Sequence, residues 1–492
     1  MQTLPANIYS VASVREIDRL AIEEHGVPGY TLMTSAAAAA VRDARTQFPD
    51  ATRWQVICGP GNNAGDGYVV ARLAAQDGIV VSAVTLIEPD QLRGDAATAY
   101  NDFAAEGGIV MRWDGNLDTE STLLIDAMLG SGLERLVEGD YAAAVAAINA
   151  HPSPVHALDI ATGIHGDTGE VLGCAVLADL TTTFVGLKAG LFLGDGPNYC
   201  GRICFADLDI PEACRQRVEM TFRRIDERYL AAVLPKRRRG AHKGDFGHVL
   251  VVGGGPGMPG AARLCAEAAL RAGAGRVSVA THPDHAMSIT STRPELMCRG
   301  VASGDELAEM LANADVVAFG PGLGQSEWAQ SMYAAVASVS QSTVWDADAL
   351  NLLAKEPKSI ENRIITPHPG EAATLLQCQS SSVQADRPDA VTALVGRYGG
   401  VAVLKGAGTL IAAGDGAPVI STAGNPGMAA AGMGDVLTGI IAALLAQGLS
   451  LADAAKAGVE VHARAGDIAA EGGERGMLAS DLLEAIRSVV NP

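Results

Sequence analysis

Short runs of consecutive apolar residues recur along the chain, and most are followed by a glycine-rich turn and a segment with helical periodicity. In the first half such runs predict strands at residues 54–58, 123–126 and 155–158. Runs of the same kind predict strands at residues 247–252 and 401–404 in the second half. Continuous apolar runs are typical of strands buried on both faces, and their alternation with helices favours parallel sheets. The pattern therefore predicts an α/β protein.

Helical periodicity is clearest near the two ends of the chain. Residues 13–25 predict an amphipathic helix, with Ser13 as its N-cap and Glu16 completing a capping box. A long apolar segment that begins at Val436 predicts a buried helix. Other helices are expected over residues 32–48, from Tyr68 onward and over residues 261–272, with further strands at residues 80–87, 109–112, 184–187 and 202–207.

Length and charge limit the possible functions. At 492 residues the chain is too long for one ordinary domain, and two domains are expected. Asp and Glu outnumber Lys and Arg by 56 to 36, a net charge of −20, which argues against affinity for nucleic acid or for an anionic membrane. None of the eight cysteines belongs to a CxxC pair, so reduced thiols are expected and a zinc site is not.

The clearest break in composition falls at residues 223–244, so we expect one domain at residues 1–222 and another at residues 223–492. The break contains a basic run at residues 236–239, followed by His242 and Lys243. A solvated linker is one interpretation, and a border of a phosphate site in the second domain is the other. Neither a signal peptide nor an apolar run of membrane-spanning length is evident, which predicts a cytoplasmic location.

Polar side chains follow three predicted strands of the first half. Asn63, Asp126 and Asp159 come at or just after strand ends, and Thr162 follows closely. Since the carboxyl ends of parallel strands meet at one edge of a sheet, these side chains are expected in one crevice. Their oxygen atoms are suited to a hard cation. An asparagine- and glycine-rich turn over residues 59–67, or a loose dinucleotide-binding loop, is the alternative.

In the second half, the segment from Gly432 to Asp435 predicts an anion site in front of the helix that begins at Val436. The first amides of a helix lack partners, the helix dipole is positive there, and glycine lets a ligand approach the backbone. A carboxylate would repel phosphate unless it acts as a base for a hydroxyl that attacks phosphorus. The alternative is that Asp435 is a helix N-cap.

Further polar residues at strand ends in the second half are Asp346, His368, Glu371 and Lys405. A GxGxxG pattern also occurs at residues 255–260, which would suggest a dehydrogenase. Its two prolines remove amides that a pyrophosphate loop uses, and this argues against that interpretation.

The motifs GPGNNAGDGY, IDAMLGSGLER and ALDIATGIHGDTG resemble the N-terminal domain of the bifunctional NAD(P)H-hydrate repair enzymes, an epimerase of the R and S hydrates of NADH and NADPH. The resemblance implies a Rossmann-like three-layer αβα sandwich and proton transfer by Asp159. It implies a potassium ion at Asn63, Asp126 and Thr162. The family usually has proline where this chain has Ala161. The substrate-binding residues implied are Asn62, Asn63, Ala64, Gly65, Asp66, Gly130, Ser131, Gly132, Leu133, Glu134, Arg135, Leu136 and Asp159.

The second half resembles the ribokinase-like αβα fold and, within it, the ADP- or ATP-dependent NAD(P)H-hydrate dehydratases. The motifs that carry this resemblance are HKGDFGHVLVVGG, GMPGAA, FGPGLG, DADALN, TPHPGE, LKGAGTLI and GNPGMAAAGMGDVLTGIIAAL. It implies that Asp435 is the catalytic base and that Glu371 is a candidate for holding a magnesium-bound water. The hydrate is implied near Ala261, Gly322, His368 and Asp435, and the nucleotide near Lys405, Gly406, Ala407, Gly408, Thr409 and Gly434.

Together the two resemblances predict an isomerase and lyase that epimerises the hydrates NADHX and NADPHX and dehydrates the S form with ADP, giving AMP and phosphate. K+ in the first domain, Mg2+ in the second and a homo-oligomer are expected. One alternative is a ribokinase-like kinase of the hydroxyethylthiazole-kinase type with a non-catalytic nucleotide-binding first domain. Another is a nucleotide-sensing interaction protein without turnover.

Overall fold

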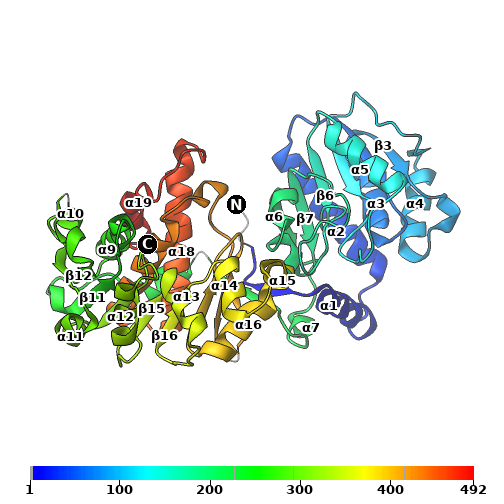
Figure 1. Ribbon diagram of the computed structural model, residues 1–492. Helices are drawn as coiled ribbons and strands as arrows, with labels where there is room; N and C mark the ends of the chain where they lie inside the picture. The colour runs from blue at the N-terminus through cyan, green and yellow to red at the C-terminus, as the bar shows by residue number, and fades with distance from the viewer. Residues whose placement is uncertain (1–3, 227, 292, 415) are drawn as a thin grey trace. The chain divides into compact units, whose positions relative to one another are not determined.

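The computed structural model describes residues 4–226, 228–291, 293–414 and 416–492. The chain divides into two compact units, unit 1 (Met1–Phe222) and unit 2 (Arg223–Pro492). Each unit contains a largely parallel sheet with helices packed against it (Figure 1). Within the described part of the chain, no helix has the length and apolarity needed to cross a bilayer.

The main sheet of unit 1 has seven parallel strands in the order β4-β3-β2-β5-β6-β7-β9. The chain starts at β2, runs outward to β4, and then returns to β5 on the other side of β2. This reversal is the point at which ligands bind in open parallel sheets. The strands are β2 (Arg53–Cys58), β3 (Val80–Thr85), β4 (Ile109–Arg112), β5 (Leu123–Ala127), β6 (Val155–Leu158), β7 (Leu180–Phe184) and β9 (Arg202–Ala206).

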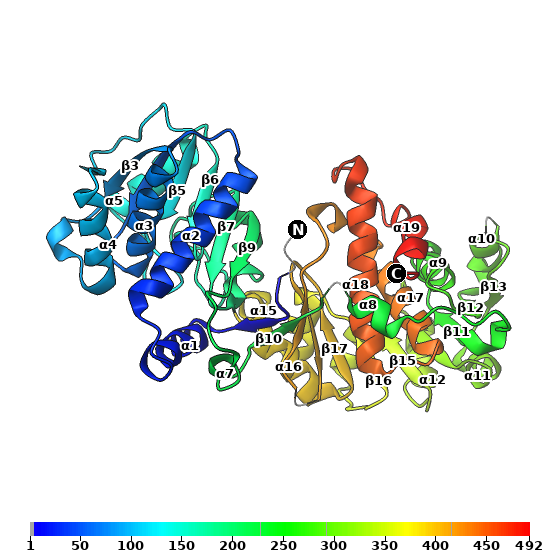
Figure 2. The ribbon, with the colours of Figure 1, turned by 180° about the vertical axis from the view of Figure 1, so that it is seen from behind.

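Helices cover both faces of this sheet. Successive residues of a strand point to opposite faces, so Val56 packs in the cluster formed with α2, α3 and α4, whereas Ile57 packs in the cluster formed with α5. Figure 2 shows α2 and α3 crossing in front of the strands. The helices are α1 (Val11–Glu23), α2 (Gly29–Gln47), α3 (Asn62–Gln76), α4 (Gly94–Ala105), α5 (Asp140–Ala150), α6 (Gly196–Tyr199) and α7 (Glu212–Arg215), and a small pair is formed by β1 (Asn7–Tyr9) and β8 (Leu187–Lys188).

Unit 2 has a parallel sheet in the order β13-β12-β11-β14-β15-β16-β17, continued by the antiparallel strands β18 and β19. The strands are β11 (His248–Val252), β12 (Arg276–Thr281), β13 (Met297–Gly300), β14 (Val316–Phe319), β15 (Ser342–Trp345), β16 (Arg363–Ile365), β17 (Val401–Leu404), β18 (Thr409–Ala413) and β19 (Val419–Ser421), and β10 (Phe222–Arg224) pairs with β19.

The core of unit 2 is built around α17 (Met433–Ala446), whose residues from Val436 to Leu445 are all buried. It packs closely on α9 (Pro259–Arg271): a Cβ added at Gly439 would lie 2.0 Å from the carbonyl oxygen of Cys265. The other helices are α8 (Tyr229–Val233), α10 (Ala286–Thr290), α11 (Gly304–Ala312), α12 (Glu327–Val336), α13 (Asp348–Lys355), α14 (Pro369–Leu376), α15 (Ser380–Ala385), α16 (Arg387–Tyr398), α18 (Leu451–Ala469) and α19 (Leu482–Val489).

Three details of the predicted elements are wrong. The N-cap of α1 is Ser10, whose Oγ accepts from the backbone N of Ser13 at 3.1 Å, so the capping box predicted at Ser13 does not form. The strand predicted at residues 184–187 is interrupted, because β7 ends at Phe184 and Val185 has a φ of 70°. The helix predicted to start at Tyr68 starts at Asn62.

The early start of α3 has a packing reason. Gly65 and Gly67 suggested a turn, but both lie inside the helix where neighbours leave no room for a side chain. A Cβ at Gly65 would be 2.5 Å from Met33 Cε, and one at Gly67 would be 2.5 Å from the Cβ of Ala127. These glycines therefore allow close packing and do not end the helix.

Candidate functional sites

A cavity of about 720 Å³ lies at the carboxyl ends of the strands in unit 1. Three of the predicted binding residues are not among its lining: Ala64 and Gly65 are buried in the packing of α3, and Leu136 is 56% exposed. The predicted residues that do line it are Asn62, Asn63, Asp66, Gly130, Ser131, Gly132, Leu133, Glu134, Arg135 and Asp159.

Asp159 forms an ion pair with Lys188, whose side chain is 1% exposed. Lys188 Nζ also donates to Phe184 O at 2.8 Å and to Thr183 Oγ1 at 3.1 Å, and the second carboxylate oxygen of Asp159 accepts from Ser131 N at 3.0 Å. Burial alone would raise the pKa of Asp159, but the charge and hydrogen bond of Lys188 outweigh it and lower the pKa. Asp159 is therefore ionised at neutral pH.

The backbone of Asp159 adopts a φ of 68°. Left-handed backbone costs a non-glycine residue about 1 kcal/mol or more and persists only where the surroundings hold it. Here the backbone N of Asp159 donates to Thr182 O at 2.8 Å, and the side chain is held as described above. The carboxylate is thus fixed in the cavity wall.

Two further carboxylates, Asp18 and Asp66, face the same cavity. Burial raises the pKa of Asp66 well above its usual value, and the charges of Asp159 and Asp18 raise it further. Burial also raises the pKa of Asp18 to about 6, with Lys188 opposing and Asp159 adding to the shift. The raised pKa favours the protonated form of Asp66, which can donate a hydrogen bond next to the ionised Asp159.

Sequence reasoning missed Lys188 and Asp18. Asp18 lies in the amphipathic helix predicted at residues 13–25, and both Asp18 and Arg15 of that helix line the cavity. Lys188 ends an apolar run, as Lys405 does, and that shared position was a signal that could have found it.

Below the cavity, Asp126 and Thr162 are buried together. Thr162 donates to Asp126 through its hydroxyl at 2.7 Å and through its backbone N at 2.8 Å. Burial raises the pKa of Asp126 to about 6, against the effect of these hydrogen bonds. Both polar atoms of the Asn63 amide are buried with no protein partner among the described residues. This donor set of amide, carboxylate and hydroxyl oxygens fits a hard cation. Although Ala161 stands where the family usually has proline, the backbone at Thr162 is anchored, because Val176 N donates to Thr162 O at 2.8 Å.

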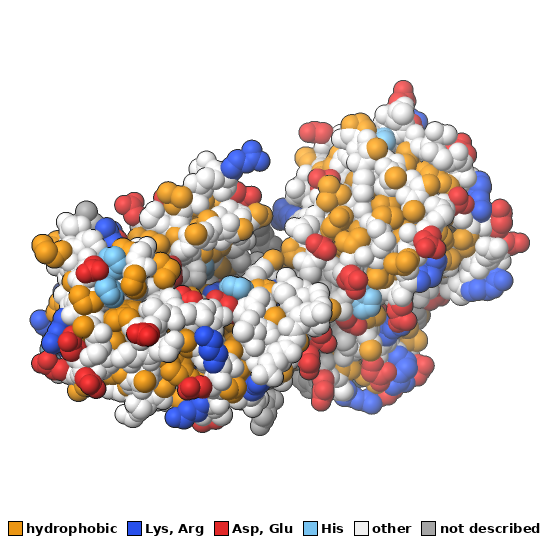
Figure 3. Space-filling model, viewed as in Figure 1, with side chains coloured by type: hydrophobic (Ala, Val, Ile, Leu, Met, Phe, Trp, Pro, Cys, Tyr) orange, Lys and Arg blue, Asp and Glu red, His pale blue; other side chains and the backbone are white. Residues whose placement is uncertain are grey.

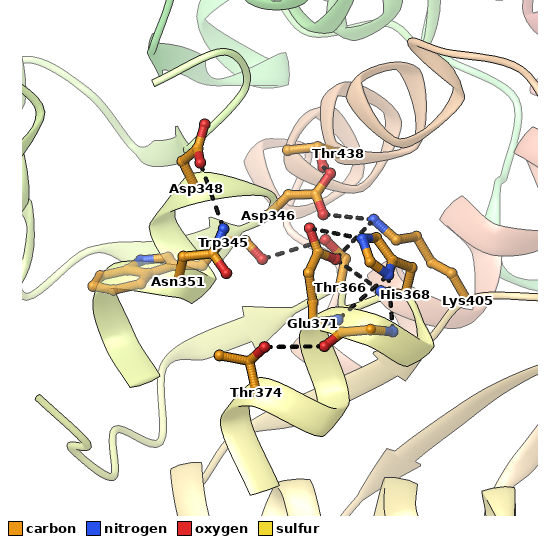
Figure 4. Close-up of polar contacts among 11 residues, drawn as sticks. Trp345, Asp346, Asp348, Asn351, Thr366, His368, Glu371, Thr374, Lys405 and Thr438 are labelled. Carbon is orange, nitrogen blue, oxygen red and sulfur yellow. Dashed lines mark hydrogen bonds and ion pairs between the residues drawn. The ribbon is translucent and has the colours of Figure 1, made fainter. Parts of the chain in front are cut away.

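In unit 2, the charged residues Asp346, Glu371 and Lys405 meet at the carboxyl ends of the strands (Figure 4). Lys405 Nζ lies 2.7 Å from one oxygen of Asp346 and 3.7 Å from Glu371. The other oxygen of Asp346 accepts from the hydroxyl of Thr438, on α17, at 3.0 Å. Burial would raise the pKa of Asp346, but Lys405 holds it below its usual range. Figure 3 shows that the surface of unit 2 is hollowed, with acidic, basic and histidine side chains close together in the hollow.

His368 is the N-cap of α14. Its Nδ1 accepts from the backbone N of Gly370 at 3.0 Å and of Glu371 at 3.3 Å, and Glu371 accepts from His368 N at 2.8 Å. Since Nδ1 is an acceptor here, the proton of a neutral ring is on Nε2, which lies 3.5 Å from the other oxygen of Glu371. Burial, together with the charge of Asp346, raises the pKa of Glu371 against the effect of Lys405.

Asp435 lies in the first turn of α17. The N-cap is Gly432, with a φ of 91°, so the alternative that Asp435 caps the helix is wrong. A Cβ at Gly432 would be 2.8 Å from Leu264 Cδ1. The backbone N–H groups of Gly434 and Asp435 have no recorded acceptor among the described residues. Burial, followed by the charge of Asp346, raises the pKa of Asp435 to about 7, with Lys405 opposing the shift.

Glycines bring the remaining predicted residues of unit 2 together. A Cβ at Gly434 would lie 3.1 Å from both Lys405 Nζ and a carboxylate oxygen of Asp346. Gly322, with a φ of 60°, packs against Ala261, since a Cβ there would be 2.9 Å from the Ala261 Cβ. These contacts gather the predicted hydrate-binding and nucleotide-binding positions on one edge of the sheet.

The loop at residues 405–408 joins β17 to β18 and is held by a buried arginine that the sequence analysis did not single out. Arg387 donates to the carbonyl oxygens of Gly408 at 3.0 Å and Leu404 at 3.4 Å. A Cβ at Gly406, where φ is 141°, would be 2.5 Å from the guanidinium of Arg387. Thr409 Oγ1 closes the loop by donating to Gly406 O at 2.9 Å.

The interpretation that His242 or Lys243 borders a phosphate site with Asp435 is wrong. Both precede β11, at the amino ends of the strands, and a Cβ at Gly275 would be 1.8 Å from Lys243 O just before β12 begins. Asp435 is at the opposite edge of the sheet.

Two family models match the chain: residues 249–488 match the model described as NAD(P)H-hydrate dehydratase, and residues 29–190 match that of the YjeF-related protein N-terminus. The bifunctional NAD(P)H-hydrate repair enzyme of Coxiella burnetii is 47% identical over 99% of this chain and 99% of its own length. That of Escherichia coli is 43% identical over 100% of this chain and 95% of its own.

Among the solved structures that resemble part of the chain are two bacterial proteins. A hypothetical protein from Streptococcus mutans is 31% identical, with a TM-score of 0.51, and covers 54% of this chain and 98% of its own. A ribokinase-like superfamily protein from Enterococcus faecalis is 28% identical, with a TM-score of 0.51, and covers 56% of this chain and 97% of its own. The second likeness agrees with the predicted ribokinase-like fold.

The relatives from C. burnetii and E. coli align over both units. The alternative of a small-molecule kinase gives the first unit no chemistry, whereas the match of both units to one kind of enzyme accounts for the ionised Asp159 as well as for Asp435. The chain belongs to the family of bifunctional NAD(P)H-hydrate repair enzymes.

Proposed function

We propose that unit 1 interconverts the R and S hydrates of NADH and NADPH and that unit 2 dehydrates the S hydrate with ADP, giving AMP and phosphate. The observation that carries the proposal is Asp435, a buried carboxylate in the first turn of α17 with a pKa raised to about 7. A base of that pKa beside free helix amides is suited to phosphoryl transfer at neutral pH. The names of the C. burnetii and E. coli relatives support the proposal.

In unit 2 the reaction begins when Asp435 accepts the proton of the C6 hydroxyl as that oxygen attacks the terminal phosphate of ADP. The bond from this phosphorus to the bridging oxygen breaks, and AMP leaves. The backbone amides of Gly434 and Asp435 stabilise the charge that develops. The C6–O bond then breaks and releases phosphate, while the neighbouring carbon C5 gives up a proton to the departing phosphate, and the ring double bond is restored. The step succeeds because phosphate is a better leaving group than hydroxide.

Lys405 is proposed to position the nucleotide and Asp346 to position Lys405. The 2.7 Å contact between Lys405 Nζ and Asp346 holds the ammonium in place. In that position Lys405 Nζ is 3.1 Å from the point that a Cβ on Gly434 would occupy. A larger residue than glycine at position 434 would block that approach.

Mg2+ is proposed to enter with the phosphates of the nucleotide, since it is usually bound through phosphates and a few carboxylates. Glu371 fits a magnesium-bound water only in part, because one of its oxygens accepts from His368 N and Lys405 lies 3.7 Å away. No step of the reaction is assigned to this ion.

In unit 1 Asp159 is proposed to accept the proton of the C6 hydroxyl. Carbon C6 also carries the ring nitrogen, so removal of that proton forms a carbonyl and breaks the C6–N1 bond. A proton from Lys188 or Asp66 balances the charge on nitrogen. Reclosure on the other face of the carbonyl, with the protons returned, gives the epimer.

K+ is proposed at Asn63, Asp126 and Thr162. The orphaned amide of Asn63 and the buried carboxylate of Asp126 support this assignment. The ion would supply positive charge that offsets the carboxylates around the cavity. A cytoplasmic location and a homo-oligomer stay predictions.

One assay tests the whole proposal. NADH hydrate of mixed R and S forms is incubated with the protein and either ADP or ATP, and the absorbance of NADH is followed. The proposal expects complete recovery with ADP, because epimerisation feeds the S form to unit 2. Recovery that stops at the S fraction would refute epimerisation, and phosphorylation of hydroxyethylthiazole without recovery of NADH would favour the kinase alternative.

A further inference from the structure

A second large cavity lies in unit 2, with a volume of about 1320 Å³. It is lined by the segment that leads into β11 and by the C-terminal ends of α9, α17 and α19. It is therefore at the amino ends of the strands, whereas Asp435 is at the carboxyl ends. Helix α17 has Asp435 in its first turn and Leu444 in the cavity wall, and its 14 residues at about 1.5 Å each span about 20 Å.

The charges around this cavity are strongly unbalanced. Asp245 is the acidic residue among its described lining residues, and it is already engaged by His242, whose backbone N donates to it at 2.9 Å. Five basic residues line the cavity, in a chain whose net charge is −20: Lys236, Arg237, Arg238, Arg271 and Arg487. This is a local positive potential in an acidic protein.

Helix C-termini carry partial negative charge, which by itself would repel an anion. Here the carbonyl groups at these ends already have donors. Arg237 donates to Gly273 O, and Gln447 Nε2 donates to Ala272 O at 3.1 Å and Ala443 O at 2.9 Å. The Arg237 guanidinium also stacks 3.6 Å above the ring of Phe246. The guanidinium of Arg237 is thus already engaged by contacts within the cavity wall.

The other four basic side chains are differently placed. Within the described ranges, Lys236, Arg238, Arg271 and Arg487 have no recorded carboxylate within 4.0 Å and no recorded side-chain hydrogen bond. Their donors are available to a ligand. Arginine in particular binds phosphate through two parallel hydrogen bonds.

The wall also has apolar residues, among them Phe246, Leu270, Leu444, Leu449 and Val490. A cavity of this volume accommodates a nucleotide-sized molecule. We propose that this cavity is a second ligand site of unit 2, which binds a small polyphosphate anion such as a nucleoside di- or triphosphate. Neither step of the proposed repair reaction uses it, because Leu444 in its wall is about 14 Å along α17 from Asp435.

Hydrogen–deuterium exchange of the full-length protein with inorganic tripolyphosphate tests the proposal, because it separates the two anion sites. The expected result is protection at residues 235–246 and 487–492, in addition to any protection at residues 405–409 and 424–435. ATP as a second probe should protect the same segments. Protection confined to the segments around Asp435 would overturn the proposal.

Variants sharpen this test. The double variant Arg271→Gln/Arg487→Gln should weaken tripolyphosphate binding at the second cavity at least about tenfold, because charge-assisted hydrogen bonds from two guanidinium groups are lost. The double variant to Lys should retain most of the affinity. Arg239→Gln is the matched control, because Arg239 belongs to the same basic run but does not line the cavity.

Dehydration of the hydrate should be unchanged in all three variants, which shows that they are folded. Unaltered binding by the Gln double variant would refute the site. An equal loss in Arg239→Gln would also refute it, because it would mean that only the general field of the basic run attracts the anion.

Discussion

Asp159 and Asp435 are both proposed as bases, yet their surroundings move their pKa values in opposite directions. The ammonium of Lys188 keeps Asp159 ionised, whereas burial and the charge of Asp346 raise the pKa of Asp435 to about 7. The sequence could nominate both residues from their positions after strands and glycines. It could not predict their pKa values, since those depend on Lys188 and Asp346, which come from distant parts of the chain.

The raised pKa of Asp435 predicts a pH dependence of dehydration. The base must be ionised, so kcat/KM should rise with pH, with a midpoint near 7, and then level off. The folded-state pKa exceeds the ordinary value of an aspartate, so the native state retains this proton at higher pH than the unfolded state does. The stability that this proton contributes is present below about pH 4 and lost as pH rises through 7. Asp435→Ala should abolish dehydration and spare epimerisation. A flat profile between pH 5 and 9 would contradict the assignment of Asp435 as base.

Lys188 should matter for epimerisation alone. In Lys188→Met the carboxylate of Asp159 loses its counter-charge, so burial raises its pKa and the fraction ionised at pH 7 falls. We expect epimerisation to slow by about 100-fold or more and its pH profile to move to higher pH, as measured by chiral chromatography of the hydrates. Dehydration is the internal control. Thr183→Val, which removes one contact of Lys188 and keeps the charge, should have a much smaller effect.

At the scale of elements, the buried strands were predictable from sequence because parallel strands covered on both faces are continuous apolar runs. β2, β5, β6, β11 and β17 begin and end within one residue of the apolar runs that predicted them. The start of α3 was not predictable, because Gly65 and Gly67 are there for contacts with Met33 and Ala127, which are distant in sequence. Glycine gives the same signal in sequence whether it bends a chain or admits a neighbour.

The contact of α17 with α9 allows a direct test of that distinction. Gly439→Ala would place a methyl group 2.0 Å from the carbonyl oxygen of Cys265 and should destabilise the protein by about 1–3 kcal/mol. Gly396, in α16, has nothing within 4 Å of the position of its Cβ, so Gly396→Ala should stabilise by about 0.5–1 kcal/mol. Urea denaturation measures the free energy of unfolding of each variant, and the comparison holds when the slope of that free energy against urea concentration is the same in all of them. Equal effects of the two substitutions would mean that helix propensity, and not packing, governs position 439.

At the scale of the whole molecule, each unit holds a complete set of candidate residues at the carboxyl edge of its own sheet. The hydrate can therefore pass between the activities by diffusion. An equimolar mixture of the Asp159→Asn and Asp435→Ala variants should convert a pure R hydrate to NADH when ADP is present. The Asp159→Asn variant alone should convert it much more slowly. The measurement is the recovery of NADH absorbance. No recovery in the mixture would mean that both activities must be present in one chain.

The unpaired amide of Asn63, beside the buried Asp126, has a consequence for folding. If K+ binds these groups only when β2, β5 and the turn after β6 are assembled, the ion acts as a folding ligand of unit 1. Stability then increases with the logarithm of K+ concentration once that concentration exceeds the dissociation constant, by about 1.4 kcal/mol for each tenfold increase. The potassium content of the solution would thus set how firmly the epimerising unit is folded, and would leave unit 2 unaffected.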